Sequence, residues 1–182
     1  MAMLAATLVA TCTKICTSYK TTYMWGVFGS PVTTSIIQQK RSQYPNWYTA
    51  AKVAQFNALV GKGYFGFDCV GMIKGVLWGW KGDASKTYGG ATYASNGVPD
   101  IGADTMITRC SGVSTSFARV ANGEALWMSG HIGVYLGGGK GAECTAAWSS
   151  KCMITAVANI GSISGLNSRR WAKHGKLPYV SY

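Results

Sequence analysis

The spacing of hydrophobic residues changes from helical to strand-like near residue 125, and this change limits the folds open to the chain. Helical spacing is seen first in the N-terminal segment, at Leu4, Leu8, Cys12, Ile15 and Tyr19. Two further helical stretches cover 47–60 and 67–80, whereas 82–102 is rich in glycine and is predicted to be a loop. Strand-like segments follow at 125–128, 131–136, 142–147 and 152–157. Helices followed by strands predict an α+β fold with an antiparallel sheet.

The length of the chain fits one domain that spans 1–182. Hydrophobic residues make up 48% of it, as expected for a globular protein with a core. The N-terminal segment lacks the basic start of a signal peptide, so we interpret it as the first helix of the domain. No stretch reaches the roughly 18 apolar residues of a membrane span. We therefore expect a soluble, monomeric protein made in the cytoplasm.

The net charge of the chain indicates which kinds of partner it can attract. It has 17 lysines and arginines against six acids, for a formal net charge of +11. A field of that sign attracts polyanions such as nucleic acid, anionic lipid or the acidic polymers of bacterial walls. The basic residues are spread along the chain, so an ordinary solvated basic surface remains the alternative.

The cysteines and histidines do not have the spacing of a metal site. Six cysteines are present, and without an export signal we expect free thiols rather than disulfides. Cys12 and Cys16 have no partnered second pair, and the two histidines, His131 and His174, lie far apart in sequence. We therefore predict neither a metal ion nor a cofactor.

One cysteine precedes an apolar helix in the segment FDCVG, residues 67–71. Asp68 is a good N-cap for that helix, which would place Cys69 in its first turn. Unpaired backbone N–H groups and the positive end of the helix dipole favour a thiolate there, which is the form that a nucleophile needs. The alternative is a buried thiol that only packs, and a base is needed to decide between them.

The segment GHIGVYL, residues 130–136, supplies a candidate base in a strand. Alternation puts His131 and Gly133 on one face and the apolar residues on the other, which is the core face. Gly133 leaves room beside the histidine for a helix end or a substrate, so we assign it to substrate binding. A core histidine bonded to the backbone is the alternative for His131. His174 lies among basic residues and is expected to be exposed and structural.

A general base also needs a third group that orients its ring, and the next strand offers two candidates. A two-residue turn at 138–139 would pair 134 with 143 and put Glu143 on the face opposite His131. A three-residue turn centred on Gly138 would instead pair 133 with 143, which places Glu143 diagonal to His131 on the same face. In that register Thr145 lies directly opposite His131 and is the second candidate.

Taken together, the two motifs resemble those of the NlpC-type papain-like peptidases of bacterial cell walls. They are FDCVG before an apolar helix and GHIGVYLG, residues 130–137, before a strand with a polar residue. The resemblance extends to YMWG at 23–26 and to WAKHGKLPY at 171–179, which looks like the ending of stand-alone catalytic domains in phage lysins. It implies a papain-like fold with N-terminal helices on a central antiparallel sheet, and a single catalytic domain without a separate wall-binding module.

The resemblance also implies roles for individual residues. Cys69 would be the nucleophile, His131 the base and Glu143 the orienting group, while Tyr23 and Asp68 would hold the free amine of a stem peptide. Two positions depart from the family. Val70 replaces the serine common after the cysteine, which removes a polar contact to substrate, and Glu143 stands where histidine is more usual.

The function that these expectations describe is a peptidoglycan-cleaving cysteine endopeptidase. By resemblance the bond cleaved is that between γ-D-glutamyl and the diamino acid of the stem peptide. A phage lysin that a holin releases to the wall fits a chain without a signal peptide. A CHAP-like amidase or cross-bridge peptidase is the alternative among enzymes, and a basic nucleic-acid-binding module is the alternative of another class.

Overall fold

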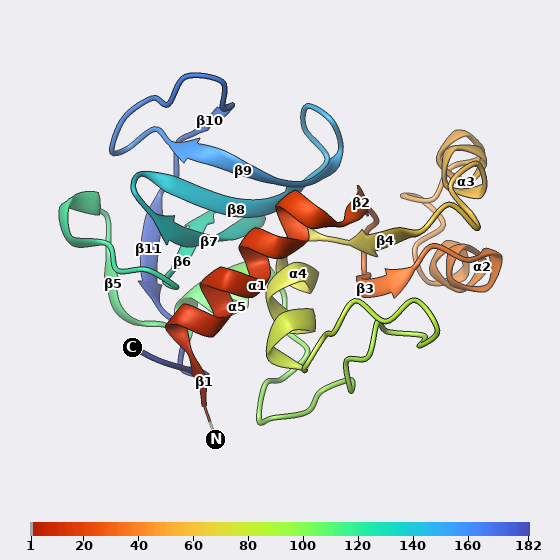
Figure 1. The fold of residues 1–182 in the computed structure, drawn as a ribbon, viewed down its shortest axis with the longest axis horizontal. Helices are drawn as coiled ribbons and strands as arrows, with labels where there is room; N and C mark the ends of the chain where they lie inside the picture. The colour runs from red at the N-terminus through yellow and green to blue at the C-terminus, as the bar shows by residue number, and fades with distance from the viewer. Residues whose placement is uncertain (1) are drawn as a thin grey trace.

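The computed structural model describes residues 2–182, and Figure 1 shows their arrangement. The helices are α1 (Ala5–Ser18), α2 (Thr34–Gln43), α3 (Ala50–Asn57), α4 (Cys69–Leu77), α5 (Ala103–Thr108) and the 3-10 turn η1 (Phe117–Arg119). The first strands are β1 (Met3–Leu4), β2 (Lys20–Tyr23), β3 (Phe28–Pro31), β4 (Tyr64–Phe67), β5 (Ser111–Ser114) and β6 (Ala125–Met128). The later strands are β7 (His131–Gly137), β8 (Lys140–Thr145), β9 (Lys151–Val157), β10 (Ser168–Arg169), β11 (Lys173–Lys176) and β12 (Val180–Ser181).

A seven-stranded sheet in the order β10-β9-β8-β7-β6-β11-β5 forms the centre of the molecule. Its neighbouring strands are antiparallel except at one edge, where β10 runs parallel to β9. Helices α1 and α4 contact each other and pack on the same face of this sheet, against β7 and β8 (Figure 1). The predicted α+β class is confirmed, with a mixed sheet in place of a purely antiparallel one.

A second sheet, β2-β4-β3, extends from this centre toward α2 and α3 (Figure 1). Helices α2 and α3 pack on each other beside it and not on the central sheet. The sequence patterns indicated no strand between the first helix and residue 47, so β2 and β3 were missed. Their sequences, KTTY and FGSP, do not alternate apolar and polar residues. Phe67, expected at the start of the helical stretch 67–80, instead ends β4.

The N-terminal helix is present and buries the apolar stripe that its spacing predicts. Leu8, Cys12 and Ile15 are fully buried against the central sheet. Leu4 departs from the stripe: it precedes the helix, pairs in β1 with β12, and is 61% exposed. This parallel pair brings the two ends of the described chain together (Figure 1). Within residues 2–182 no helix combines the length and hydropathy needed to cross a membrane.

His174 is buried, so the expectation of an exposed side chain was wrong. It lies in β11, which inserts between β6 and β5 in the central sheet. Its Nδ1 contacts the carboxylate of Glu124, and its Nε2 lies 2.9 Å from the carbonyl oxygen of Ser116. Its neighbours Lys173 and Lys176 are exposed. The basic composition of the segment therefore suggested that the His174 side chain is exposed as well.

Candidate active site

Cys69 is the first residue of α4, directly after the strand β4. The predicted N-cap is present, since the Asp68 side chain accepts a hydrogen bond from the backbone N–H of Gly71. Its other carboxylate oxygen accepts one from the N–H of Gly26 at 2.8 Å. Asp68 therefore ties the start of the helix to the segment that joins β2 and β3, and this fixes where Cys69 lies.

Gly71 allows this close approach of helix and loop. A Cβ atom at position 71 would lie 2.1 Å from the carbonyl oxygen of Val27, which is backbone and cannot move aside. The same Val27 oxygen accepts a hydrogen bond from the N–H of Asp68 at 2.8 Å. The glycine in FDCVG is thus required for α4 to begin against the 24–27 turn.

The Cys69 thiol is 5% exposed, and its environment opposes ionisation. Burial raises the pKa of the thiol to about 12, and the carboxylate of Asp68 adds to the rise. Backbone N–H groups of Ile132, Val70 and Cys69 itself act in the opposite direction but are outweighed. The dipole at the helix start alone would favour a thiolate, but burial outweighs it and the resting Cys69 is a thiol. A nucleophilic Cys69 needs a base that takes its proton.

His131 and Glu143 are brought together, with the His131 Nε2 2.7 Å from the Glu143 Oε2. Burial alone would raise the pKa of the Glu143 carboxyl, but His131 and Arg169 outweigh it and hold that pKa below its usual value. Because Glu143 is ionised, Nε2 carries the hydrogen and donates it. The other ring nitrogen, Nδ1, has no hydrogen-bond partner within residues 2–182 and is free to accept a proton.

The β7–β8 hairpin reaches this arrangement by a route that neither predicted turn describes. The turn has two residues, 138 and 139, and closes the pair Gly137 and Lys140. A bulge between Tyr135 and Gly137 then adds one residue to β7, so that Val134 pairs with Ala142. This restores the register of the three-residue turn and puts Glu143 on the face of His131. Gly137, Gly138 and Gly139 all have positive φ, which permits the tight turn after the bulge.

The carboxylate of Glu143 is fully buried and has three partners. Besides His131, the Nε of Arg169 lies 2.6 Å from Oε2, and the hydroxyl of Thr155 donates to Oε1 at 2.7 Å. The Arg169 Nε–H is poorly aligned for a hydrogen bond, so this contact is an ion pair. Thr145, the second candidate for orienting His131, instead accepts a hydrogen bond from the Arg169 guanidinium at 3.1 Å.

Trp171 covers the face of the strand on which His131 lies. Its indole stacks on the imidazole, with ring centroids 5.4 Å apart and planes 9° from parallel. A Cβ at Gly133 would lie 3.1 Å from this indole and 2.6 Å from the carbonyl oxygen of Ala142. The space that Gly133 leaves is therefore filled by Trp171, and Gly133 does not line the cleft described next.

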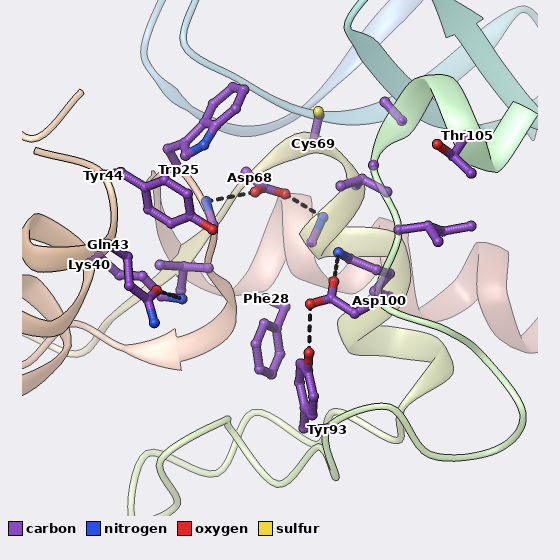
Figure 2. A pocket seen from close by; sticks show the side chains of 18 of the residues that line it. Trp25, Phe28, Lys40, Gln43, Tyr44, Asp68, Cys69, Tyr93, Asp100 and Thr105 are labelled. Atoms are coloured by element: carbon purple, nitrogen blue, oxygen red, sulfur yellow. Dashed lines mark hydrogen bonds and ion pairs between the residues drawn. The ribbon is translucent and has the colours of Figure 1, made fainter. Parts of the chain in front are cut away.

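A cleft of about 720 Å³ opens at Cys69 and runs between α2 and the segment 100–105 (Figure 2). Cys69, Asp68 and Trp25 all line it and lie in the upper part of the view in Figure 2. Lys40, Gln43 and Tyr44 come from the side of α2 (Figure 2). Its volume lies within the range of about 300–1,000 Å³ that is typical of ligand-binding clefts.

Tyr23 lies behind Cys69 and not in the wall of this cleft. Its strand β2 pairs with β4, with Tyr23 opposite Phe67, and its ring packs on Trp47. Burial raises the pKa of its hydroxyl above the usual value, and the neighbouring Cys69 and Asp68 add to the effect. Tyr23 is thus a neighbour of the thiol, 7% exposed.

Three residues around His131 and Glu143 were not predicted to take part in the site: Thr155, Arg169 and Trp171. Arg169 and Trp171 lie in or next to the two-residue strand β10, which has no pattern of its own. The only signal for Thr155 was alternation in the strand 152–157, which fixes its face but not its partner.

Comparison of the sequence with protein-family models and with curated proteins gives no match. Within residues 2–182 no group of three or more histidine, cysteine or acidic side chains is arranged to hold a metal ion. All six cysteines are free thiols. The resemblance to the NlpC-type peptidases therefore depends on the two sequence motifs, FDCVG and GHIGVYLG.

Proposed function

We propose that this protein is an NlpC-type, papain-like cysteine endopeptidase that cleaves the stem peptides of bacterial peptidoglycan. The observation that carries the proposal is the pairing of His131 with a buried, ionised Glu143 on the strand that packs against the helix start bearing Cys69. The backbone N–H of Ile132, the residue after His131, is near enough to Cys69 to lower the pKa of its thiol, so the two motifs are neighbours in the fold. A base oriented by a third group beside a thiol is the arrangement that nucleophilic catalysis requires.

The reaction begins when Nδ1 of His131 accepts the proton of the Cys69 thiol. The thiolate attacks the carbonyl carbon of the scissile peptide bond, and the backbone N–H groups at the start of α4 stabilise the oxyanion. His131 then gives its proton to the leaving amine, and a thioester to Cys69 remains. Water, deprotonated by His131, hydrolyses the thioester and restores the thiol. Throughout, Glu143 stabilises the charged imidazolium and holds the ring by Nε2, so that Nδ1 remains available for the thiol proton.

The resemblance supports the γ-D-glutamyl to diamino-acid bond as the target, and the charge of +11 supports attraction to anionic wall polymers. Wall binding of this origin should weaken steeply as salt rises, since exposed charges are screened over about 10 Å at 0.1 M. Removing teichoic acid from the wall should weaken it as well. Binding that does not depend on salt would point to a carbohydrate pocket instead.

Mass spectrometry of purified wall digested with the protein tests the proposal. Endopeptidase action releases fragments cut within the stem peptide, whereas an amidase or a cross-bridge peptidase leaves different new ends. Cys69→Ala should abolish these fragments while the fold is kept, and Cys110→Ala, a partly buried thiol outside the cleft, should retain them. A Cys69→Ala protein that lyses wall at the wild-type rate would overturn the mechanism. Salt-sensitive nucleic-acid binding without any wall cleavage would favour the binding module.

A further inference from the structure

The charged side chains that line the cleft are Lys40, Lys74, Asp68, Asp100 and Asp104. The three carboxylates all have donors from the protein. Asp68 accepts from two backbone N–H groups, and Asp104 accepts from the indole of Trp127 and the N–H of Gly130. Asp100 contacts the ammonium of Lys74 with one oxygen and accepts from the Tyr93 hydroxyl at 2.8 Å with the other (Figure 2).

Lys40 is the cation that this pattern leaves without a carboxylate. Within residues 2–182 no carboxylate oxygen lies within 4.0 Å of its Nζ, and its one hydrogen-bond partner is the neutral Oε1 of Gln43 at 2.9 Å. An ammonium group has three N–H donors, so two remain for a ligand. Gln43 accepts one hydrogen bond from the ammonium without neutralising its charge (Figure 2).

The surroundings of Lys40 favour an anionic ligand. Burial lowers the pKa of its ammonium and the charge of Lys74 adds to the decrease, while the more distant carboxylates of Asp68 and Asp100 offset part of it. A carboxylate bound at Nζ would compensate for this loss of solvation. Val70, also in the cleft wall beside Cys69, offers no polar side-chain atom for the same purpose.

We propose that Lys40 is a specificity residue that binds a free carboxylate of the peptide substrate, so that the enzyme discriminates against the corresponding amide. The inference depends on the proposed function, because it assumes that a peptide occupies the cleft with its scissile bond at Cys69. In the proposed substrate this carboxylate is the α-carboxylate of the γ-linked glutamyl residue, the free carboxylate nearest to the scissile carbonyl. An amide at that position keeps the shape but loses the charge-assisted hydrogen bond.

Two synthetic stem peptides test the inference: one with the free α-carboxylate on the γ-linked glutamyl residue, and the same peptide as the α-amide. Binding is measured by titration calorimetry to the Cys69→Ala protein, which cannot turn the peptides over. We expect the acid to bind about ten- to a hundredfold more tightly than the amide, as for a hydrogen bond between charged groups.

Adding Lys40→Met to this protein should remove the preference for the acid, and Lys40→Arg should keep most of it. Arg41→Met, an exposed cation on the same helix outside the cleft, should leave it unchanged.

Equal binding of the acid and the amide, or no binding of either, would overturn the carboxylate site. So would a Lys40→Met protein that keeps the preference. Hydrolysis by the wild-type protein separates this failure from failure of the proposed function. If both peptides are cut with the same KM, the endopeptidase stands and the role of Lys40 falls. If the acid binds preferentially but neither peptide is cut, the cleft is an acidic-peptide site and the endopeptidase falls.

Discussion

The molecule contains two histidine–glutamate pairs with buried carboxylates, and the two imidazoles differ in what they can still bind. His131 and Glu143 lie on the neighbouring strands β7 and β8, next to the helix that bears Cys69. His174 and Glu124 lie near the other edge of the same sheet, at β11 and just before β6. Both carboxylates are almost fully buried, with side chains 0% and 5% exposed.

The difference lies in the second nitrogen of each imidazole. In His174 both ring nitrogens are occupied, one by Glu124 and the other by the carbonyl oxygen of Ser116. In His131 one nitrogen is held by Glu143, while the other has no protein partner within residues 2–182. The side chain of His131 is also the more exposed, at 14% against 5% for His174. A buried acid therefore orients either ring, but only a ring with a free nitrogen can exchange a proton with a neighbour.

Replacing His131 gives the sharpest contrast between the two pairs. His131→Asn should lower kcat on wall peptide by about a thousandfold or more, because loss of a general base typically costs 10²–10⁴ and here the thiol is also un-ionised at rest. The measurement is release of stem-peptide fragments, with circular dichroism to show that the fold is kept. An active His131→Asn protein would mean that the free nitrogen of His131 is not the base. The functional distinction between the His131 and His174 pairs would then be withdrawn.

Glu143→Gln tests the acid of the same pair. The amide keeps the shape but removes the charge that stabilises imidazolium, so turnover should fall by about ten- to a thousandfold. Alkylation of Cys69 at neutral pH should slow as well, because the protonated histidine that accompanies a thiolate becomes less stable. Thr145→Val is the matched control: its hydroxyl bonds Arg169 and not His131, so it should change both rates less. If Thr145→Val were the more damaging change, the assignment of Glu143 would be withdrawn.

Sequence alone predicted the parts of the site that local patterns determine. The N-cap at Asp68, the helix start at Cys69 and the strand carrying His131 all follow from residues within a few positions. The contact of His131 with Glu143 was one of two alternatives, because a bulge near Leu136 decides the face and leaves no mark on the alternation. Arg169, the cation beside Glu143, comes from a strand of two residues whose place is fixed only by packing.

His174→Leu should affect stability rather than turnover. The leucine fills much of the space but leaves Glu124 buried without a partner, and breaking a buried ionic pair costs on the order of 3 kcal/mol of unfolding free energy. Urea unfolding measures the loss, and kcat per folded molecule should stay near that of the wild type. Glu124→Gln with His174→Leu should recover part of the stability, since no unpaired carboxylate is then left at position 124. A large fall in kcat with an unchanged fold would show that the two pairs are functionally coupled.

The smallest expected effect concerns Arg169, a cation that the His174 pair lacks. Because the pKa of Glu143 is depressed in the folded protein, its ionised form contributes stability that is complete above the ordinary carboxyl range, about pH 4.3. That contribution is lost as pH falls through the lower pKa of the folded state. Arg169→Leu removes one of the groups that depress this pKa, so the loss should be complete at a higher pH and the contribution at neutral pH should shrink by about 1 kcal/mol. Unfolding free energies from about pH 7 to about pH 3 measure the shift.

Arg170→Leu, at the exposed neighbouring position, is the control and should leave the profile unchanged. Profiles that coincide for Arg169→Leu and the wild type would mean that His131 alone keeps Glu143 ionised, and the two pairs would then differ only in the free nitrogen of His131.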